Sequence, residues 1–129
     1  MSTIFSIKAL RIMCKTLPLI INNNTNQESI SEQMLASYYS GLAISETKTA
    51  IAHAVSYPLT AKYGLPHGIA CSFTLPALLN DCKEHLIHLM GEDLFYEVKK
   101  ILESIDFTTR MNEFLDKKNI HLHVKEMSQ

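Results

Sequence analysis

The sequence predicts an all-α protein, a helical bundle, from three observations. Apolar residues recur at three- and four-residue steps along most of the chain, which is the period of helices with one buried face. Strand patterns are nearly absent, and glycine occurs only at positions 41, 64, 68 and 91. This scarcity excludes a glycine-rich turn that would bind a dinucleotide through backbone amides, so these residues contain no phosphate-binding loop.

The first two predicted helices are separated by a polar loop. Apolar residues over 4–17 share one face, and we expect Pro18 to end that helix because a proline inside a helix loses a hydrogen bond and clashes with the preceding turn. Ser29-x-x-Glu32 has the pattern of a capping box, which predicts the start of a second helix. That helix is expected to reach Ala43.

The middle of the chain predicts a third helix over 45–58, ended by Pro58. Pro66 suits the first turn of the next helix, where its missing amide hydrogen costs nothing. The apolar run 69–79 is too uniform for a surface, so we interpret it as a buried central helix, kinked near Pro76.

The C-terminal part predicts two amphipathic helices, 92–105 and 108–118, with lysines and glutamates on their outer faces. Residues 119–129 have no helix cap and alternate only weakly, which indicates a short extension or a frayed tail.

The composition fits one folded domain, and we expect residues 1–129 to form a single helical domain. A formal net charge of −1 argues against a nucleic-acid partner, which would require a basic surface. The apolar runs are too short to cross a bilayer, and the N-terminus has no signal-peptide pattern. We therefore expect a cytoplasmic protein with no nucleic-acid or membrane partner.

The cysteines, Cys14, Cys71 and Cys82, form an odd set without a CxxC spacing. This argues against a disulfide scaffold and against a cysteine-based zinc site. We expect all of them to be reduced and buried. Cys71 follows His67 by one helical turn, but its apolar neighbours favour an inert thiol, because reactivity requires a stabilised thiolate.

Two histidines, His53 and His67, lie in the apolar stretch 52–68. Neutral imidazole is the commonest protein ligand of zinc and iron, and a loop between two helices would bring both rings to one point. They would form half of a site, since a catalytic ion usually has three protein ligands or more. From the residues alone, the alternative is equally open: His53 is a buried polar residue bonded to a backbone carbonyl, and His67 is an ordinary residue after a proline.

The remaining histidines give weaker signals. His85 and His88 are three residues apart and share a helix face, but their charged neighbours favour a solvated surface. His121 and His123 flank Leu122 in the tail, where a metal site is less expected still.

The run 37–79 resembles the helical domain of the iron-containing (group III) alcohol dehydrogenases. That family's signature is a small-Gly-Leu-Ala stretch, a histidine, a Pro-Leu, a Pro-His-Gly and a Leu-Pro, and this sequence has each element in order. Residues 5–17 resemble the family more loosely. The resemblance implies the C-terminal helical domain of a dehydroquinate synthase-like fold. It also implies hydride transfer between NAD or NADP and a small alcohol or aldehyde.

In that family one aspartate and three histidines hold the metal, and His53 and His67 match the last two histidines. The resemblance implies a divalent ion, with Fe²⁺ favoured over Zn²⁺. The family's upstream Asp-Ala-x-x-His segment and glycine-rich nucleotide-binding domain are not found in these residues. The chain therefore looks like a piece of such an enzyme, inactive by itself, and a homo-oligomer is compatible with the resemblance.

Two further positions are assigned by the same resemblance. Many family members have a histidine four residues after the first ligand; here that position is Tyr57, which we assign as the catalytic residue that replaces it. A phenol donates a hydrogen bond but shuttles protons less readily than imidazole at neutral pH. This variant resembles a branch that includes phosphonate aldehyde reductases. Ile44 falls at a substrate-channel position and would leave room for a small substrate, although a plain core role is at least as compatible.

A second hypothesis is a non-catalytic helical interaction or dimerisation domain that retains the family core. In that case the apolar surface would serve as an interface with a partner or a second copy.

Overall fold

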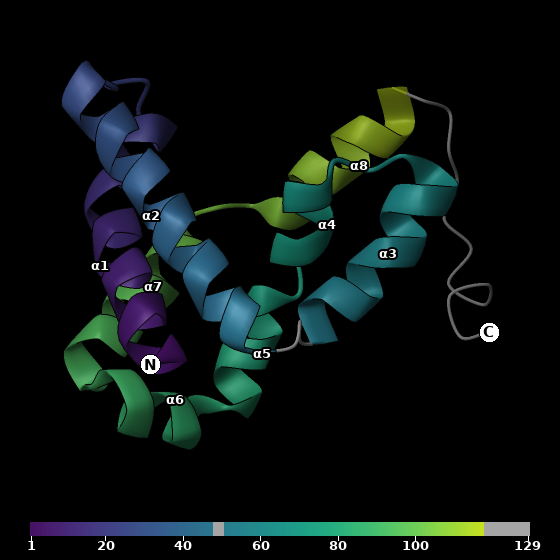
Figure 1. The fold of residues 1–129 in the computed structure, drawn as a ribbon. Helices are drawn as coiled ribbons and strands as arrows, with labels where there is room; N and C mark the ends of the chain where they lie inside the picture. Colours follow the sequence, from purple (N-terminus) through teal and green to yellow (C-terminus); the bar gives the residue numbers. More distant parts are fainter. Residues whose placement is uncertain (48–50, 118–129) are drawn as a thin grey trace. The chain divides into compact units, whose positions relative to one another are not determined.

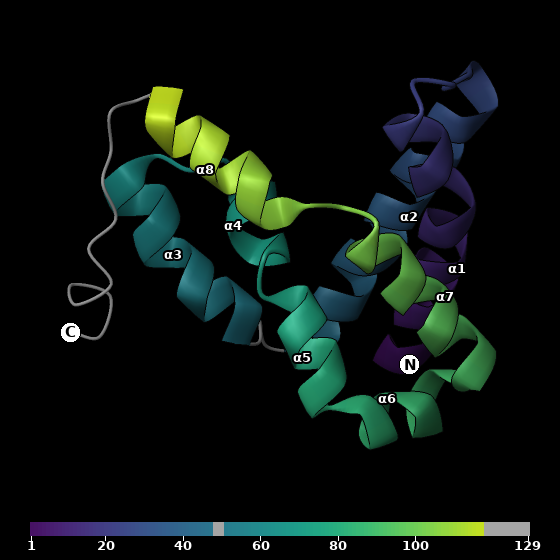
Figure 2. The same cartoon turned by 180° about the vertical axis from the view of Figure 1, so that it is seen from behind.

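The computed structural model describes residues 1–47 and 51–117, and helices account for most of them (Figures 1 and 2). No strand occurs within these ranges, which confirms the all-α prediction. The helices are α1 (Ser2–Ile21), α2 (Gln27–Glu46), α3 (Ile51–Tyr63), α4 (His67–Ser72), α5 (Leu75–Asp81), α6 (Lys83–Met90), α7 (Glu92–Glu103) and α8 (Phe107–Lys117). The predicted tail 119–129, with His121 and His123, lies outside the described residues.

The described chain divides into two compact units, each with its own core. The first unit contains residues 1–47 and 79–104, and the second contains 51–78 and 105–117. None of the helices in these ranges combines the length and the apolar character that a bilayer crossing requires.

The first unit is built on an antiparallel pair, α1 and α2, joined by a short loop (Figure 1). Asn26 is the N-cap of α2: its side chain accepts from the Ser29 amide at 2.8 Å, and the Ser29 hydroxyl accepts from the Asn26 amide at 2.9 Å. Ser29 is therefore part of a capping box, but as the third residue of the helix (N3) and not as the N-cap. The predicted N-cap at Ser29 is wrong by three residues, because Asn26 is an equally good cap and lies earlier in the chain.

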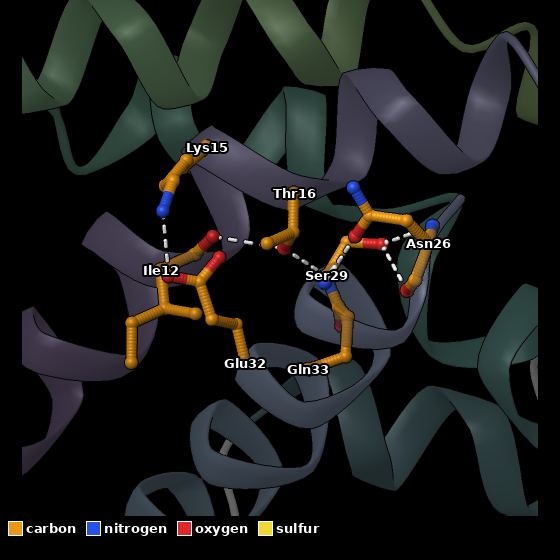
Figure 3. Close-up of polar contacts among 7 residues, drawn as sticks. All are labelled: Ile12, Lys15, Thr16, Asn26, Ser29, Glu32 and Gln33. Atoms are coloured by element: carbon orange, nitrogen blue, oxygen red, sulfur yellow. Dashed lines mark hydrogen bonds and ion pairs between the residues drawn. The ribbon is translucent and has the colours of Figure 1, made fainter. Parts of the chain in front are cut away.

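Polar side chains connect α1 and α2 along this pair (Figure 3). Gln33 donates to the Thr16 hydroxyl, which donates to the Ile12 carbonyl at 2.8 Å. Thr16 is fully buried, so both of its hydrogen bonds compensate for lost hydration. Lys15 pairs with Glu32 at 2.6 Å on the outer side. This network fixes the register of the pair.

The core of the first unit lies where α1 meets α7, and α6 packs against α7. Its buried members are Cys14, Leu79, Leu94, Phe95 and Val98. Phe95 has no exposed surface, which makes it the central side chain of this core.

Two prolines lie inside helices, so the predicted ends at Pro18 and Pro58 are wrong. α1 continues to Ile21 and α3 to Tyr63. Past Pro18, the Asn22 amide still donates to the Pro18 carbonyl at 3.1 Å. A proline costs one hydrogen bond and about 3 kcal/mol inside a helix, and packing of the residues beyond it outweighs that cost.

The second unit consists of α3, α4 and α8, and α4 packs against both of the others. Its buried core is formed by Leu59, Leu65, Ala70 and Leu115. Leu59 directly follows Pro58 and is almost fully buried. Burial of this side chain stabilises the part of α3 that continues beyond the proline.

The predicted buried central helix over 69–79 is wrong. That run forms two short helices, α4 and α5, which are interrupted at Phe73 and Thr74. Only Ala70 and Leu79 within it are buried. Pro76 lies in the first turn of α5, where a proline is tolerated, so the chain starts a new helix rather than kinking an old one. The predicted amphipathic helices over 92–105 and 108–118 correspond to α7 and α8, within a few residues at each end.

Candidate metal centre

His53 and His67 come from two helices that a tight turn folds against each other. α3 ends at Tyr63, and Gly64 takes a left-handed backbone conformation with φ of 67°, which a glycine adopts without strain. Leu65 then enters the core, and its amide donates to the Leu59 carbonyl at 3.3 Å. Pro66 is the N-cap residue of α4, so His67 is the first residue of that helix.

This turn brings the rings of His53 and His67 together. Their centroids are 5.4 Å apart, and the ring planes are inclined by 58°. His53 is half-buried and His67 is exposed. The Ser56 hydroxyl, fully buried one turn along α3, donates to the His53 carbonyl at 2.8 Å. The hydroxyl next to His53 is thus satisfied by the backbone, and the imidazole is held at the edge of the unit.

The Cys71 thiol lies beside the same histidines. Its Sγ is 3.5 Å from Nε2 and 3.8 Å from Nδ1 of His67, one turn earlier on α4. One ligand atom each from His53, His67 and Cys71 lies within 4.8 Å of the others. No other group of at least three such side chains that could hold a metal ion is found in residues 1–47 and 51–117.

These distances fit a divalent ion. Nitrogen and sulfur ligands of a tetrahedral ion, at about 2.1 and 2.3 Å from it, are about 3.6 Å apart. The separation of 3.5 Å between the Cys71 sulfur and Nε2 of His67 is close to that value, and the exposed His67 ring has room to rotate.

The cysteines differ from one another, contrary to the expectation that all are buried. Cys14 is buried in the first unit, Cys71 is half-buried and Cys82 is exposed. Burial, with Glu97 as a second cause, raises the pKa of the Cys14 thiol to about 11, so Cys14 is protonated at neutral pH. The predicted burial is therefore found at Cys14 and not at Cys71 or Cys82. The apolar letters around Cys71 were misleading, because its own side chain points along the histidine face of α4.

The other predicted site residues occupy distinct places. Tyr57 follows His53 by one turn of α3, the spacing that puts two side chains on one helix face, and its side chain is 56% exposed. Ile44 belongs to α2 in the first unit and is also exposed, so a core role is not found in the described chain. His85 and His88 are exposed on α6, in agreement with the solvated face expected for them.

Comparison with known proteins gives a family. Residues 1–126 match the family model described as "Fe-containing alcohol dehydrogenase family, C-terminal". The chain is 52% identical over 44 residues to the phosphonoacetaldehyde reductase of Streptomyces viridochromogenes, which is 34% of this chain and 11% of that protein. It is 25% identical over 97 residues to the NAD-dependent methanol dehydrogenase of Bacillus methanolicus, 70% of this chain and 26% of that protein. The chain therefore spans a minor part of these curated relatives. No solved structure matches it significantly.

Proposed function

The chain belongs to the Fe-containing alcohol dehydrogenase family, and we propose that it supplies the helical, metal-binding part of a nicotinamide-linked alcohol dehydrogenase or aldehyde reductase. The observation that carries this proposal is the approach of the His53 and His67 rings, from the starts of α3 and α4, to 5.4 Å. The motif resemblance over 37–79 implies the same two histidines as ligands, which supports the proposal.

The residues present fit a divalent ion, with His53 and His67 as two of its ligands and Fe²⁺ as the metal that the family name suggests. Bound there, the metal would supply Lewis-acid polarisation of a carbonyl or stabilisation of an alkoxide during hydride transfer. The role of the two histidines is to present imidazole nitrogens to the ion, His53 from the start of α3 and His67 from the start of α4. Half-burial of His53 limits its motion, and the exposed His67 ring can adjust to the ion.

The remaining parts of the proposed enzyme lie outside these 129 residues. The family's aspartate and first histidine ligand, and the domain that binds NAD or NADP, have no counterpart in the printed sequence. We therefore propose that the chain alone does not catalyse hydride transfer, because it cannot bind the nicotinamide through a phosphate-binding turn of its own.

Tyr57 is the proposed polar contact for the substrate. Its phenol can donate a hydrogen bond, so it would orient a carbonyl of the substrate. The proposed substrate is a small aldehyde or alcohol. A phosphonate aldehyde is favoured among them, because a stretch of 44 residues is 52% identical to a phosphonoacetaldehyde reductase. The exposed Ile44 is proposed as a channel residue of the assembled enzyme.

The test measures metal binding by the 129-residue chain. Calorimetric titration is carried out with Zn²⁺ and, in the absence of oxygen, with Fe²⁺. We expect His53→Ala and His67→Ala to abolish binding, whereas His88→Ala on α6 should leave it intact. Unchanged binding in both of the first two variants would contradict the site. Oxidation of NADH or NADPH by the chain with phosphonoacetaldehyde and added metal would contradict the need for further ligands.

A second candidate function, an interaction or dimerisation domain, is favoured by the surface of α2. Ile30, Met34 and Tyr38 follow one another at four-residue spacing and are exposed, Met34 by 70%. Ile30 and Met34 also line a shallow groove of about 450 Å³ with Ile20. An apolar stripe of this kind is typical of a protein interface. Light scattering of the chain and of Met34→Lys over a range of concentrations tests this: association that Met34→Lys abolishes would support it.

A further inference from the structure

The metal cluster contains one side chain that neither the family's ligand set nor the sequence analysis assigns. Cys71 lies one turn after His67 on α4, so the two side chains share a face of that helix. His53 faces them from α3. The resulting donor set is two imidazoles and one thiol, from two helices of the same unit.

We propose that Cys71 is a third protein ligand of the divalent ion at His53 and His67. This inference rests on the proposed metal-binding function and extends it, because three protein ligands are enough to hold an ion while a fourth position stays open. The chain would then bind a metal with its own residues, before any ligand from outside these 129 residues is added.

The geometry at Cys71 supports ligation. Its Sγ is 3.5 Å from Nε2 of His67, close to the separation of about 3.6 Å between a sulfur and a nitrogen ligand of one tetrahedral ion. Half-burial restricts the thiol to few orientations while leaving it accessible to an incoming ion. Cys14 and Cys82 belong to the first unit and are not members of the cluster.

Ligation by Cys71 has a proton balance that can be measured. Metals bind the thiolate, so the Cys71 sulfur–hydrogen bond breaks, its proton passes to solvent, and a sulfur–metal bond forms. Neutral histidines release no proton when they bind. A site that includes the Cys71 sulfur therefore releases one more proton per bound ion than a site with the histidines alone.

A thiolate also changes which metal is preferred. Thiolate is a softer ligand than imidazole or carboxylate and favours Zn²⁺ over Fe²⁺ more strongly than they do. We therefore expect the ratio of Zn²⁺ to Fe²⁺ affinity to be higher for the wild-type chain than for a chain without the Cys71 sulfur.

The first experiment is a titration of the metal-free 129-residue chain with Co²⁺, monitored by absorption spectroscopy. A sulfur-to-cobalt charge-transfer band in the near ultraviolet is expected for the wild type and for Cys82→Ser, which removes an exposed thiol as a matched control. The band should be absent in Cys71→Ser and in Cys71→Ala. Far-ultraviolet circular dichroism confirms that each variant keeps its helices.

The second experiment uses the wild-type chain, so its result does not depend on whether a variant folds. Iodoacetamide labelling with mass spectrometry is carried out with and without Zn²⁺. We expect Zn²⁺ to slow alkylation of Cys71 by at least tenfold and to leave alkylation of Cys82 unchanged.

The outcomes separate this inference from the proposed function. A missing band, a band that persists in folded Cys71→Ser, or equal alkylation of Cys71 with and without Zn²⁺ would each overturn the role of Cys71. If His53→Ala and His67→Ala still abolish cobalt binding in that case, the proposed function stands. If neither histidine variant weakens binding, both proposals fail.

Discussion

The α1–α2 pair and the α3–α4 pair are both made of two helices and a short connection, yet they use their polar groups in opposite ways. In α1–α2 the polar side chains bond to one another or to the backbone: Gln33 to Thr16, Lys15 to Glu32, and Asn26 to Ser29. In α3–α4 the turn instead presents two imidazoles and a thiol at the edge of the unit.

The two helix pairs therefore have different roles, one in stability and one in ligand binding. Polar groups that bond within the protein stabilise a fold but have no capacity left for a ligand. Metal donors have to keep a lone pair available, so they contribute less to the stability of the free chain. We therefore expect substitutions in the first unit to change stability and substitutions at the α3–α4 turn to change metal affinity.

The largest expected effect is on stability in the first unit. Phe95→Ala removes the most buried aromatic side chain, and such a truncation costs about 3–5 kcal/mol of unfolding free energy. Urea unfolding followed by circular dichroism measures it. Tyr96→Ala, at an exposed neighbouring position, is the control and should cost far less. Equal losses in the two variants would show that Phe95 does not anchor this core.

The next effect is at the turn of the second unit. Loss of a residue that hydrogen-bonds to a metal ligand lowers metal affinity by about 10–100-fold. His53→Ala removes a proposed ligand itself, so it should lower Zn²⁺ affinity by at least about 100-fold. Competition with a chromophoric chelator measures the affinity. The unfolding free energy of the metal-free variant should stay close to that of the wild type. A large loss of unfolding free energy without a change in Zn²⁺ affinity would contradict the expectation that this pair of helices determines metal affinity rather than stability.

A moderate effect is expected at the cap of α2. Asn26→Ala removes the side-chain acceptor of the Ser29 amide, and loss of such a cap costs about 1 kcal/mol. Asn24→Ala in the same loop is the matched control and should be close to neutral. Zn²⁺ affinity should be unchanged in both variants, and a loss of affinity in Asn26→Ala would indicate that the cap acts on the metal site as well.

The smallest effect is a pH dependence that originates at Cys14. Burial raises the pKa of this thiol from 9.0 to about 11 in the folded chain. Between pH 9 and 11 the unfolded chain has lost this proton and the folded chain keeps it, so the unfolding free energy falls as the pH rises. Cys14→Ala should show a shallower fall than the wild type, whereas Cys82→Ala should keep the wild-type slope. Identical slopes in all of them would rule out a contribution from Cys14.

Much of the site could be read from the residues, because its signals are local. His53, His67, the Pro-Leu and the Pro-His-Gly lie within one short stretch, and their order is specific to a family. The sequence also places Cys71 one helical turn after His67, but its apolar neighbours predict an inert, buried thiol rather than a member of the cluster. Its spacing of four from His67 was a usable signal, but the apolar letters around it indicated burial, and burial of one side chain depends on which helix face meets the core.

The helical class, the histidine pair and the family follow from the sequence by itself, since periodicity, residue identity and motif order are properties of short stretches. Tertiary structure decided where helices end and which side chains are free. α1 and α3 pass through Pro18 and Pro58, and the run 69–79 divides into two helices. The physical reason is that a proline's local cost of about 3 kcal/mol competes with burial of the residues that follow it, such as Leu59, against partners far along the chain, such as Leu115, and only the packed structure sets that balance.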